Sequence, residues 1–173
     1  FGGLCALSGA SFAVRAGHAH GIIGPNGAGK TTAFNVITGI YAPTQGDIVF
    51  RGQSIAGQRP SRIARNGIGR TFQNIRLFRN LSVLDNVRIA RDARSAYLWP
   101  SALVQLPSAR RAEKENIRVC AELLKQFGLA DVMHEQAGGL PYGSQRRLEI
   151  VRAMALQPKL LLLDEPAAGM NSA

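Results

Sequence analysis

Short, dense runs of apolar residues along the chain predict β-strands. They lie at residues 11–14, 19–23, 68–73 and 160–163. The last run, "LLLL", is apolar at every position, which is typical of a buried strand in a parallel sheet. A further stretch, "GDIVFRGQSI" at residues 46–55, predicts a hairpin that turns at Arg51-Gly52. We also expect a turn at Ala16-Gly17, between the first two runs.

Other stretches repeat their apolar residues at helical intervals. "KTTAFNVIT", residues 30–38, predicts a helix that stops at Gly39. A second helix is expected over residues 82–88, because Ser82 suits the N-cap position and Asp85 stands three positions later.

A longer amphipathic helix is predicted over residues 113–127, ending at Gly128. Its apolar stripe consists of Ile117, Cys120, Ala121, Leu124 and Phe127. Residues 91–111, which precede it, contain two prolines and a tryptophan and are expected to be irregular.

Composition sets limits on the class of protein. At 173 residues and 46% hydrophobic content, the chain suits one globular domain with its own core. No apolar run has the length of about 18 residues that a membrane-spanning helix needs. Cys5 and Cys120 lack the spacing of a metal site and indicate a reducing compartment. The formal net charge of +10 suits nucleic acid or anionic lipid, but the scattered arginines favour a solvated surface.

The stretch "GPNGAGKTT" fits the spacing G-x-x-x-x-G-K-[ST] of a phosphate-binding loop. Its glycines let the backbone curl so that N–H groups point at phosphate oxygens, and the following helix directs its N-terminus at the same anion. Lys30 is expected to reach the β- and γ-phosphates of a bound nucleotide, and the Thr31 hydroxyl to ligate Mg²⁺. The residues predicted to bind the nucleotide are Gly24, Pro25, Asn26, Gly27, Ala28, Gly29, Lys30, Thr31 and Thr32.

An acidic pair follows the last predicted strand, in "LLLLDEP". A carboxylate at the C-terminal tip of a parallel strand, next to a phosphate loop, is where a Mg²⁺ ligand belongs, so Asp164 is predicted to bind the metal. Glu165 is predicted to act as the catalytic base that polarises water for attack on the γ-phosphate.

Four motifs, in this order, resemble the ATP-binding subunits of ABC transporters: "GPNGAGKTT", "TFQN", "LPYGSQRRLEIVRA" and "LLLLDEP". "AAGMN", residues 167–171, is similar to the loop that follows the acidic pair in that family. The resemblance implies an α/β fold, with a P-loop NTPase (RecA-like) core, an antiparallel β-subdomain and an α-helical signature subdomain, C-terminally incomplete. Its expected parts are residues 1–81 for the phosphate-loop core and β-subdomain, 82–153 for the helical subdomain, and 154–173 for the last strand and loop.

The resemblance also implies that two ATPase subunits, identical or paralogous, pair head to tail with ATP and Mg²⁺ between them. Gln73 would then sense the γ-phosphate and the metal, and Phe1 would stack on adenine. The residues expected to contact the partner's nucleotide are Tyr142, Gly143 and Ser144. Further implied partners are transmembrane permease subunits and, indirectly, a periplasmic solute-binding protein. The implied location is the cytoplasmic face of the inner membrane.

The signature segment departs from the common family pattern L-S-G-G-Q, because Pro141 and Tyr142 replace its serine and first glycine. The wording "YGSQRRLEI" is similar to the ATPases of high-affinity branched-chain amino-acid importers, and importers of urea or short amides would share most of it. Arg76, Phe78 and Arg79 are candidates for the groove that meets the permease. The implied function is ATP hydrolysis that powers an ABC importer, with branched-chain amino acids as the first choice of solute.

Two other classes stay open. ABC-type ATPases of DNA repair or of ribosomes would suit a basic chain, but no heptads and no second phosphate loop occur here, so nucleic acid is not an expected partner. An unrelated phosphate-loop kinase would have no signature segment. Members of the resembled family carry a switch histidine after the acidic pair, whereas His18, His20 and His134 precede it, so the natural protein is expected to be longer.

Overall fold

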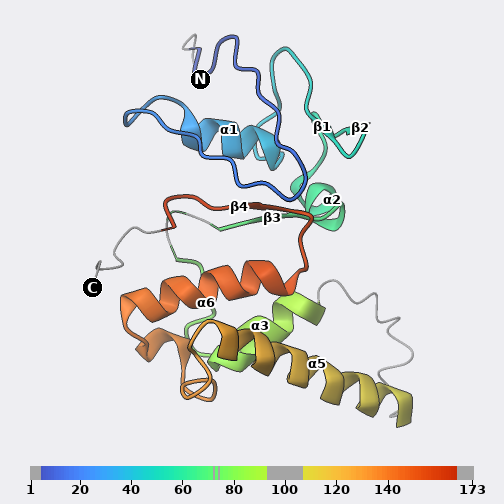
Figure 1. The fold of residues 1–173 in the computed structure, drawn as a ribbon, viewed down its shortest axis with the longest axis vertical. Coiled ribbons are helices and arrows are strands. Elements are labelled where there is room, and N and C mark those ends of the chain that lie inside the picture. Colours follow the sequence, from blue (N-terminus) through green and yellow to red (C-terminus); the bar gives the residue numbers. More distant parts are fainter. Residues whose placement is uncertain (1–4, 72, 74, 93–106, 167–173) are drawn as a thin grey trace. The chain divides into compact units, whose positions relative to one another are not determined.

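The computed structural model describes residues 5–71, 73, 75–92 and 107–166 (Figure 1). The chain divides into two compact units, residues 1–66 and residues 67–173, and each is described by itself. In the described part of the chain, no helix combines the length and the apolar character that crossing a membrane requires. The predicted subdivision at residues 81 and 153 stays a prediction.

The described part of the first unit contains two helices and a hairpin. These elements are α1 (Lys30–Ile37), β1 (Val49–Phe50), β2 (Gln53–Ser54) and α2 (Pro60–Arg65). The strands β1 and β2 pair antiparallel, and the φ angles of Arg51 and Gly52 are 51° and 79°. Two successive residues with positive φ form the tight turn that suits a two-residue hairpin, so the predicted hairpin and its turn are confirmed.

The two strands predicted before the phosphate loop are absent from this structure. Residues 11–14 and 19–23 are irregular and exposed, and Ile23 is 98% exposed. The turn between them is present, since the His18 N–H donates to the Arg15 carbonyl over 3.2 Å. A strand exists only by hydrogen bonding to a neighbour, and β1 and β2, the strands described in this unit, pair with each other. The strand predictions at these two places are therefore wrong here.

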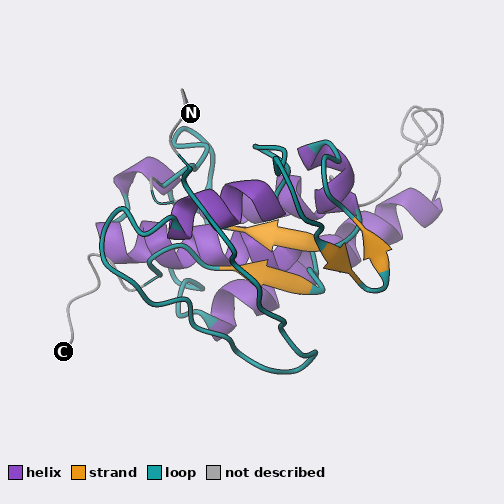
Figure 2. Cartoon of the chain, turned by 90° about the horizontal axis from the view of Figure 1, so that it is seen from above, coloured by secondary structure: helices purple, strands orange, loops and turns teal. Residues whose placement is uncertain are grey.

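The second unit contains a parallel strand pair and a group of helices. Its elements are β3 (Ile68–Arg70), α3 (Val83–Asp92), α5 (Pro107–Gln126), η1 (Ala137–Gly139), α6 (Tyr142–Ala155) and β4 (Leu160–Leu162). The strands β3 and β4 lie side by side, with Arg70 opposite Leu162 (Figure 2). The prediction that the apolar run at residues 160–163 forms a parallel strand is thereby confirmed.

The helix boundaries of this unit follow the predictions at some ends and differ at others. Ser82 caps α3 as expected, because its Oγ accepts the Asp85 N–H over 3.0 Å and donates to the Asp85 carboxylate over 2.6 Å. The helix α5 already begins at Pro107, inside the stretch predicted to be irregular. Proline is tolerated in the first turn of a helix, where its missing N–H has no partner to lose. Residues 93–106 lie outside the described part.

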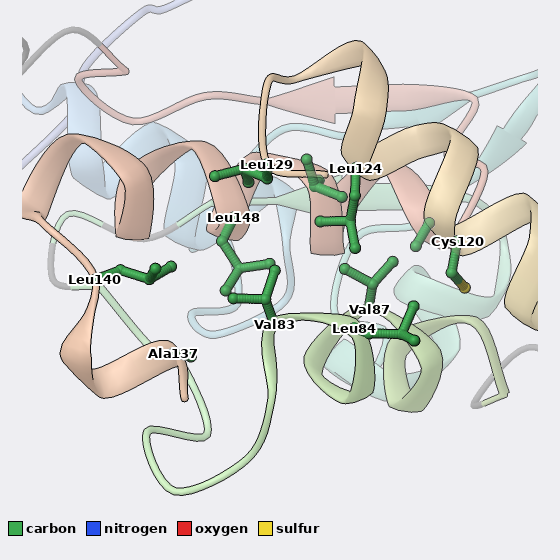
Figure 3. Packing of buried hydrophobic residues seen from close by; sticks show 11 residues of the cluster. Val83, Leu84, Val87, Cys120, Leu124, Leu129, Ala137, Leu140 and Leu148 are labelled. Carbon is green, nitrogen blue, oxygen red and sulfur yellow. The ribbon is translucent and has the colours of Figure 1, made fainter. Parts of the chain in front are cut away.

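The core of the second unit gathers residues from its three long helices (Figure 3). Val83 and Val87 of α3, Leu124 of α5 and Leu148 of α6 are fully buried there. Cys120 belongs to the same cluster, and burial raises the pKa of its thiol, as expected of a cysteine that packs as a small hydrophobe. This packing holds α6, which carries the signature motif, against α3 and α5.

Candidate functional site

The predicted phosphate loop leads directly into α1. Gly27 and Gly29 have φ angles of 82° and 83°, a backbone conformation that residues with a side chain rarely adopt. A Cβ at Gly29 would also lie 2.7 Å from the carbonyl oxygen of Ala6. The glycine that precedes the lysine is therefore required both by its backbone angle and by the close approach of another chain segment.

The N-terminus of α1 is suited to an anion. Within the described residues, no side chain caps this end of the helix, and its first turn contains no acidic residue. The first N–H groups of a helix have no partner inside the helix, and their partial positive charge attracts phosphate. Thr31 is exposed and Thr32 is half-buried in this first turn, so the nine predicted residues form one loop and helix start.

Lys30 folds back over the loop. Its Nζ donates to the carbonyl oxygens of Gly24 and Pro25, at 2.6 and 2.8 Å. The ammonium group therefore lies among the residues that are predicted to surround the phosphates. Both acceptors are neutral carbonyl oxygens. A negatively charged phosphate oxygen would therefore be a stronger partner for the ammonium group.

Asp164 lies just beyond β4, where the sequence predicted a metal ligand. Its side chain is 9% exposed and pairs with Arg70, with 3.2 Å between the guanidinium and Oδ2. The Asp164 N–H donates to the Thr71 hydroxyl over 3.2 Å, and the Thr71 N–H donates to the Leu162 carbonyl over 3.0 Å. Both strands of the parallel pair thus fix the backbone on which this carboxylate stands.

Glu165 is exposed and has a φ of 47°, in the left-handed region. Its carbonyl oxygen accepts a hydrogen bond from Arg146 of α6 over 3.0 Å, and the same guanidinium donates to the Asp164 carbonyl. Arg146 is itself 1% exposed and ion-paired to Glu149. A buried arginine therefore ties the helix of the signature motif to the backbone of the acidic pair, and it holds the Glu165 main chain in its unusual conformation.

Arg146 holds the backbone of the acidic pair, a role that the sequence alone did not predict. The available signal was an arginine and a glutamate three positions apart on the signature helix, a spacing that lets the two side chains pair.

Gln73 and the signature residue Tyr142 come together in the second unit. Both line a hollow of about 370 Å³, whose other lining residues are Ile75, Leu77, Arg79 and Gln145. Tyr142 is 49% exposed at the start of α6. Gly143 follows it in the first turn, and the Ser144 hydroxyl accepts a hydrogen bond from Arg147 over 3.0 Å. The serine is thus already engaged within its own helix.

The residues after Gln73 form an exposed aromatic and cationic surface. Phe78 is 47% exposed, and the guanidinium of Arg152 stacks over its ring, 4.9 Å from the centroid. Arg152 also donates to the Arg76 carbonyl, and burial lowers the pKa of its guanidinium. Arg152 was not predicted as part of this surface. Phe1, Phe72, Asn74 and residues 167–171, which the sequence reasoning also named, lie outside the described part.

Residues 7–168 match the family described as ABC transporter. The chain belongs to this family. It is 46% identical over 171 residues to the high-affinity branched-chain amino acid transport ATP-binding protein LivG of Escherichia coli, a match that covers 99% of this chain and 67% of LivG. It is 44% identical over 171 residues to the corresponding BraF of Pseudomonas aeruginosa, with the same coverage.

Solved structures agree with this assignment. An ATP-binding cassette of an ABC transporter in its ADP conformation has 32% sequence identity and a TM-score of 0.68, over 86% of this chain. The match covers 58% of that cassette, so the chain spans less than two thirds of the solved structure. These neighbours confirm the predicted P-loop NTPase class of the family member.

Proposed function

We propose that this chain carries the ATP-binding and ATP-hydrolysing machinery of an ABC importer for branched-chain amino acids. The observation that carries the proposal is the glycine loop at the start of α1, because it can hold phosphates and occurs in a family of ATPases. The choice of solute rests on the similarity to LivG and BraF, whose names specify branched-chain amino acid transport.

ATP binding would use the loop and the first turn of α1. The N–H groups there would donate to phosphate oxygens, and the open space at Gly27 would let a phosphate approach the backbone. Lys30 would exchange the carbonyl oxygens of Gly24 and Pro25 for the β- and γ-phosphates.

Each of the three predicted metal ligands carries an oxygen of a kind that Mg²⁺ accepts. Asp164 offers a carboxylate, Thr31 a hydroxyl and Gln73 an amide oxygen, and Mg²⁺ prefers one or two carboxylates together with phosphate and water oxygens. Bound there, the metal would neutralise charge that develops on the transferred phosphoryl group. Asp164 would be its carboxylate ligand.

Glu165 would act as general base for the attacking water. Its side chain is exposed, so it can contact water, while its backbone is held by Arg146. Gln73 would contact the γ-phosphate, and because it lines the same hollow as Tyr142, a change in its position would also alter that hollow. Phe1 remains our candidate for stacking on the adenine ring.

A complete site would need a second ATPase subunit, identical or paralogous. The start of α6, with Tyr142, Gly143 and Ser144, would face the nucleotide of that partner, where the positive end of a helix suits a phosphate. Permease subunits would meet the surface around Phe78 and Arg152, at the cytoplasmic face of the membrane, with a periplasmic binding protein supplying the solute. The transport step is tested by measuring leucine uptake in cells in which this protein carries Lys30→Ala. We expect uptake to be lost, and unchanged uptake would count against the proposed transport function.

Nucleotide binding is tested by Lys30→Ala in the full chain. We expect ATP affinity to be lost, because the substitution removes the charge that would bridge two phosphates. Equilibrium titration with ATP measures this, and Lys125→Ala, an exposed lysine of α5, is the matched control. Wild-type affinity in Lys30→Ala would show that the loop does not bind phosphate in the proposed way.

Hydrolysis is tested separately by Glu165→Gln. Glutamine has nearly the same shape but cannot accept a proton at neutral pH, so ATP affinity should persist while turnover is lost. The variant should also accumulate as an ATP-bound dimer, which size-exclusion chromatography detects. Unchanged turnover would move the catalytic base to another residue.

A further inference from the structure

A buried arginine, Arg70, forms an ion pair with Asp164, the carboxylate that the proposed function assigns to a metal ion. The guanidinium of Arg70 lies 3.2 Å from Oδ2 of Asp164, and the two side chains are 6% and 9% exposed. Arg70 reaches this position because β3 and β4 pair in parallel with Arg70 opposite Leu162, two residues before Asp164. Asp164 follows the end of β4 by two residues, so the register places Arg70 beside the point where the chain leaves the strand toward Asp164.

A charged carboxylate in this position is stabilised by a nearby cation. The Asp164 side chain is 9% exposed, and an unpaired charge with so little contact to water would be strongly destabilising. Arg70 contacts Oδ2 of this carboxylate, and a divalent cation bound to the same group would repel the guanidinium across a distance of a few ångströms. Binding of the metal would therefore weaken the hold of Arg70 on Asp164.

The backbone of Asp164 is held independently of Arg70. Its N–H is bound to the Thr71 hydroxyl and its carbonyl to Arg146. A change of partner at the side chain would therefore leave the main chain in place. The Asp164 carboxylate could then pair with either Arg70 or a metal ion from the same backbone position.

We propose that Arg70 is the resident counter-ion of Asp164 and that Mg²⁺ must displace it when Mg-ATP binds, so that Arg70 sets the magnesium concentration the site requires. The proposal rests on the proposed ATP-binding function. Arg70 acts here as a positioning residue, since it holds a metal ligand and touches neither nucleotide nor water in the reaction.

The test compares Arg70→Met with Arg118→Met in the full chain. Each substitution replaces an arginine that pairs with a carboxylate and so removes one positive charge. The control pair is exposed to solvent, since the side chains of Arg118 and Glu115 are 74% and 56% exposed. Binding of a fluorescent ATP analogue is titrated in EDTA and then at increasing Mg²⁺ concentration. In Arg70→Met we expect the Mg²⁺ concentration of half-maximal effect to fall about tenfold, as the loss of one charged competitor predicts, and in Arg118→Met to stay unchanged.

A second readout is thermal unfolding. In EDTA, the melting temperature of Arg70→Met should lie below that of the wild type. Addition of Mg-ATP should raise the melting temperature of Arg70→Met by more than that of Arg118→Met. If Arg70→Met does not fold, Arg70→Lys, which keeps the charge but loses the planar fork, should shift the Mg²⁺ requirement in the same direction by a smaller factor.

Normal nucleotide binding with an unchanged Mg²⁺ requirement in the Arg70 variants would overturn the proposal alone and leave a purely structural ion pair. Absence of nucleotide binding by the wild type at every Mg²⁺ concentration would overturn the proposed function and the role of Arg70 with it.

Discussion

Three glycines at and before the phosphate loop differ in what a side chain would meet. Gly29 has positive φ and a carbonyl oxygen 2.7 Å from the position of a Cβ, Gly27 has positive φ and open space, and Gly21 has open space without positive φ. We expect Gly21→Ala to be neutral, Gly27→Ala to destabilise the fold by about 1 kcal/mol, and Gly29→Ala by more, because strain and clash add there. Urea unfolding of the full chain measures the series, and equal losses at all three positions would contradict it.

The charged residues of the site were predictable one by one, but their partners were not. Lys30 and Asp164 each stand in a short local motif whose spacing already implies the chemistry. Arg70 lies 94 residues before Asp164, and only the register of β3 against β4 makes them neighbours. A single sequence contains no such pairing, so local reasoning could find the ligand and miss its counter-ion.

At the scale of elements, α3 is tied to the segment after Gln73 by one buried amide. The Asn86 side chain donates to the carbonyls of Phe78 and Ser82, at 3.0 and 2.9 Å, and accepts the Phe78 N–H at 2.9 Å. Asn86→Ala would remove the acceptor of the Phe78 N–H, while the Phe78 and Ser82 carbonyls would keep their bonds from the Leu81 and Asn86 N–H groups. We expect a loss of about 2 to 3 kcal/mol in the free energy of unfolding.

Circular dichroism during chemical denaturation of the full chain measures the effect of Asn86→Ala. Gln126→Ala, at the exposed last position of α5, is the matched control and should change stability little. A loss in Asn86→Ala no larger than in the control would mean that the amide contributes nothing to holding α3 against this segment.

The elements themselves were predictable in proportion to how local their signals are. The helix at Lys30–Ile37 and the cap at Ser82 depend on neighbours within four residues, and both were predicted. The runs at residues 11–14 and 19–23 signal burial, but burial in a strand depends on a partner far away in the sequence. The early start of α5 at Pro107 was missed because proline was treated as a breaker in a position where a helix accepts it.

At the scale of the whole molecule, the buried core is divided unequally between the two units. The described part of the second unit contains a cluster of eleven buried residues from α3, α5, α6 and the connecting segments. In the described part of the first unit, the buried hydrophobic residues are Ile55 and Ile63. Local stability follows buried apolar packing, so the unit that carries the phosphate loop should open far more readily than the helical one.

Hydrogen exchange should therefore show two levels of protection that nucleotide brings closer together. Without nucleotide, we expect the amides of α1 to exchange much faster than those of α3 and α6, because α1 contains no buried residue. A ligand that binds only the folded site stabilises it by about 2.7 kcal/mol at a concentration one hundred times its dissociation constant, which corresponds to about a hundredfold slower exchange. Mg-ATP at such a concentration should therefore slow exchange at residues 24–37, and Lys30→Ala should abolish that change while leaving α3 and α6 unaffected.

Mass spectrometry of the exchanged full chain, after proteolysis into peptides, measures both levels. If α1 were as protected as α6 without nucleotide, or if Mg-ATP slowed exchange equally in Lys30→Ala, stability would not be divided in this way and ATP would not act through the phosphate loop.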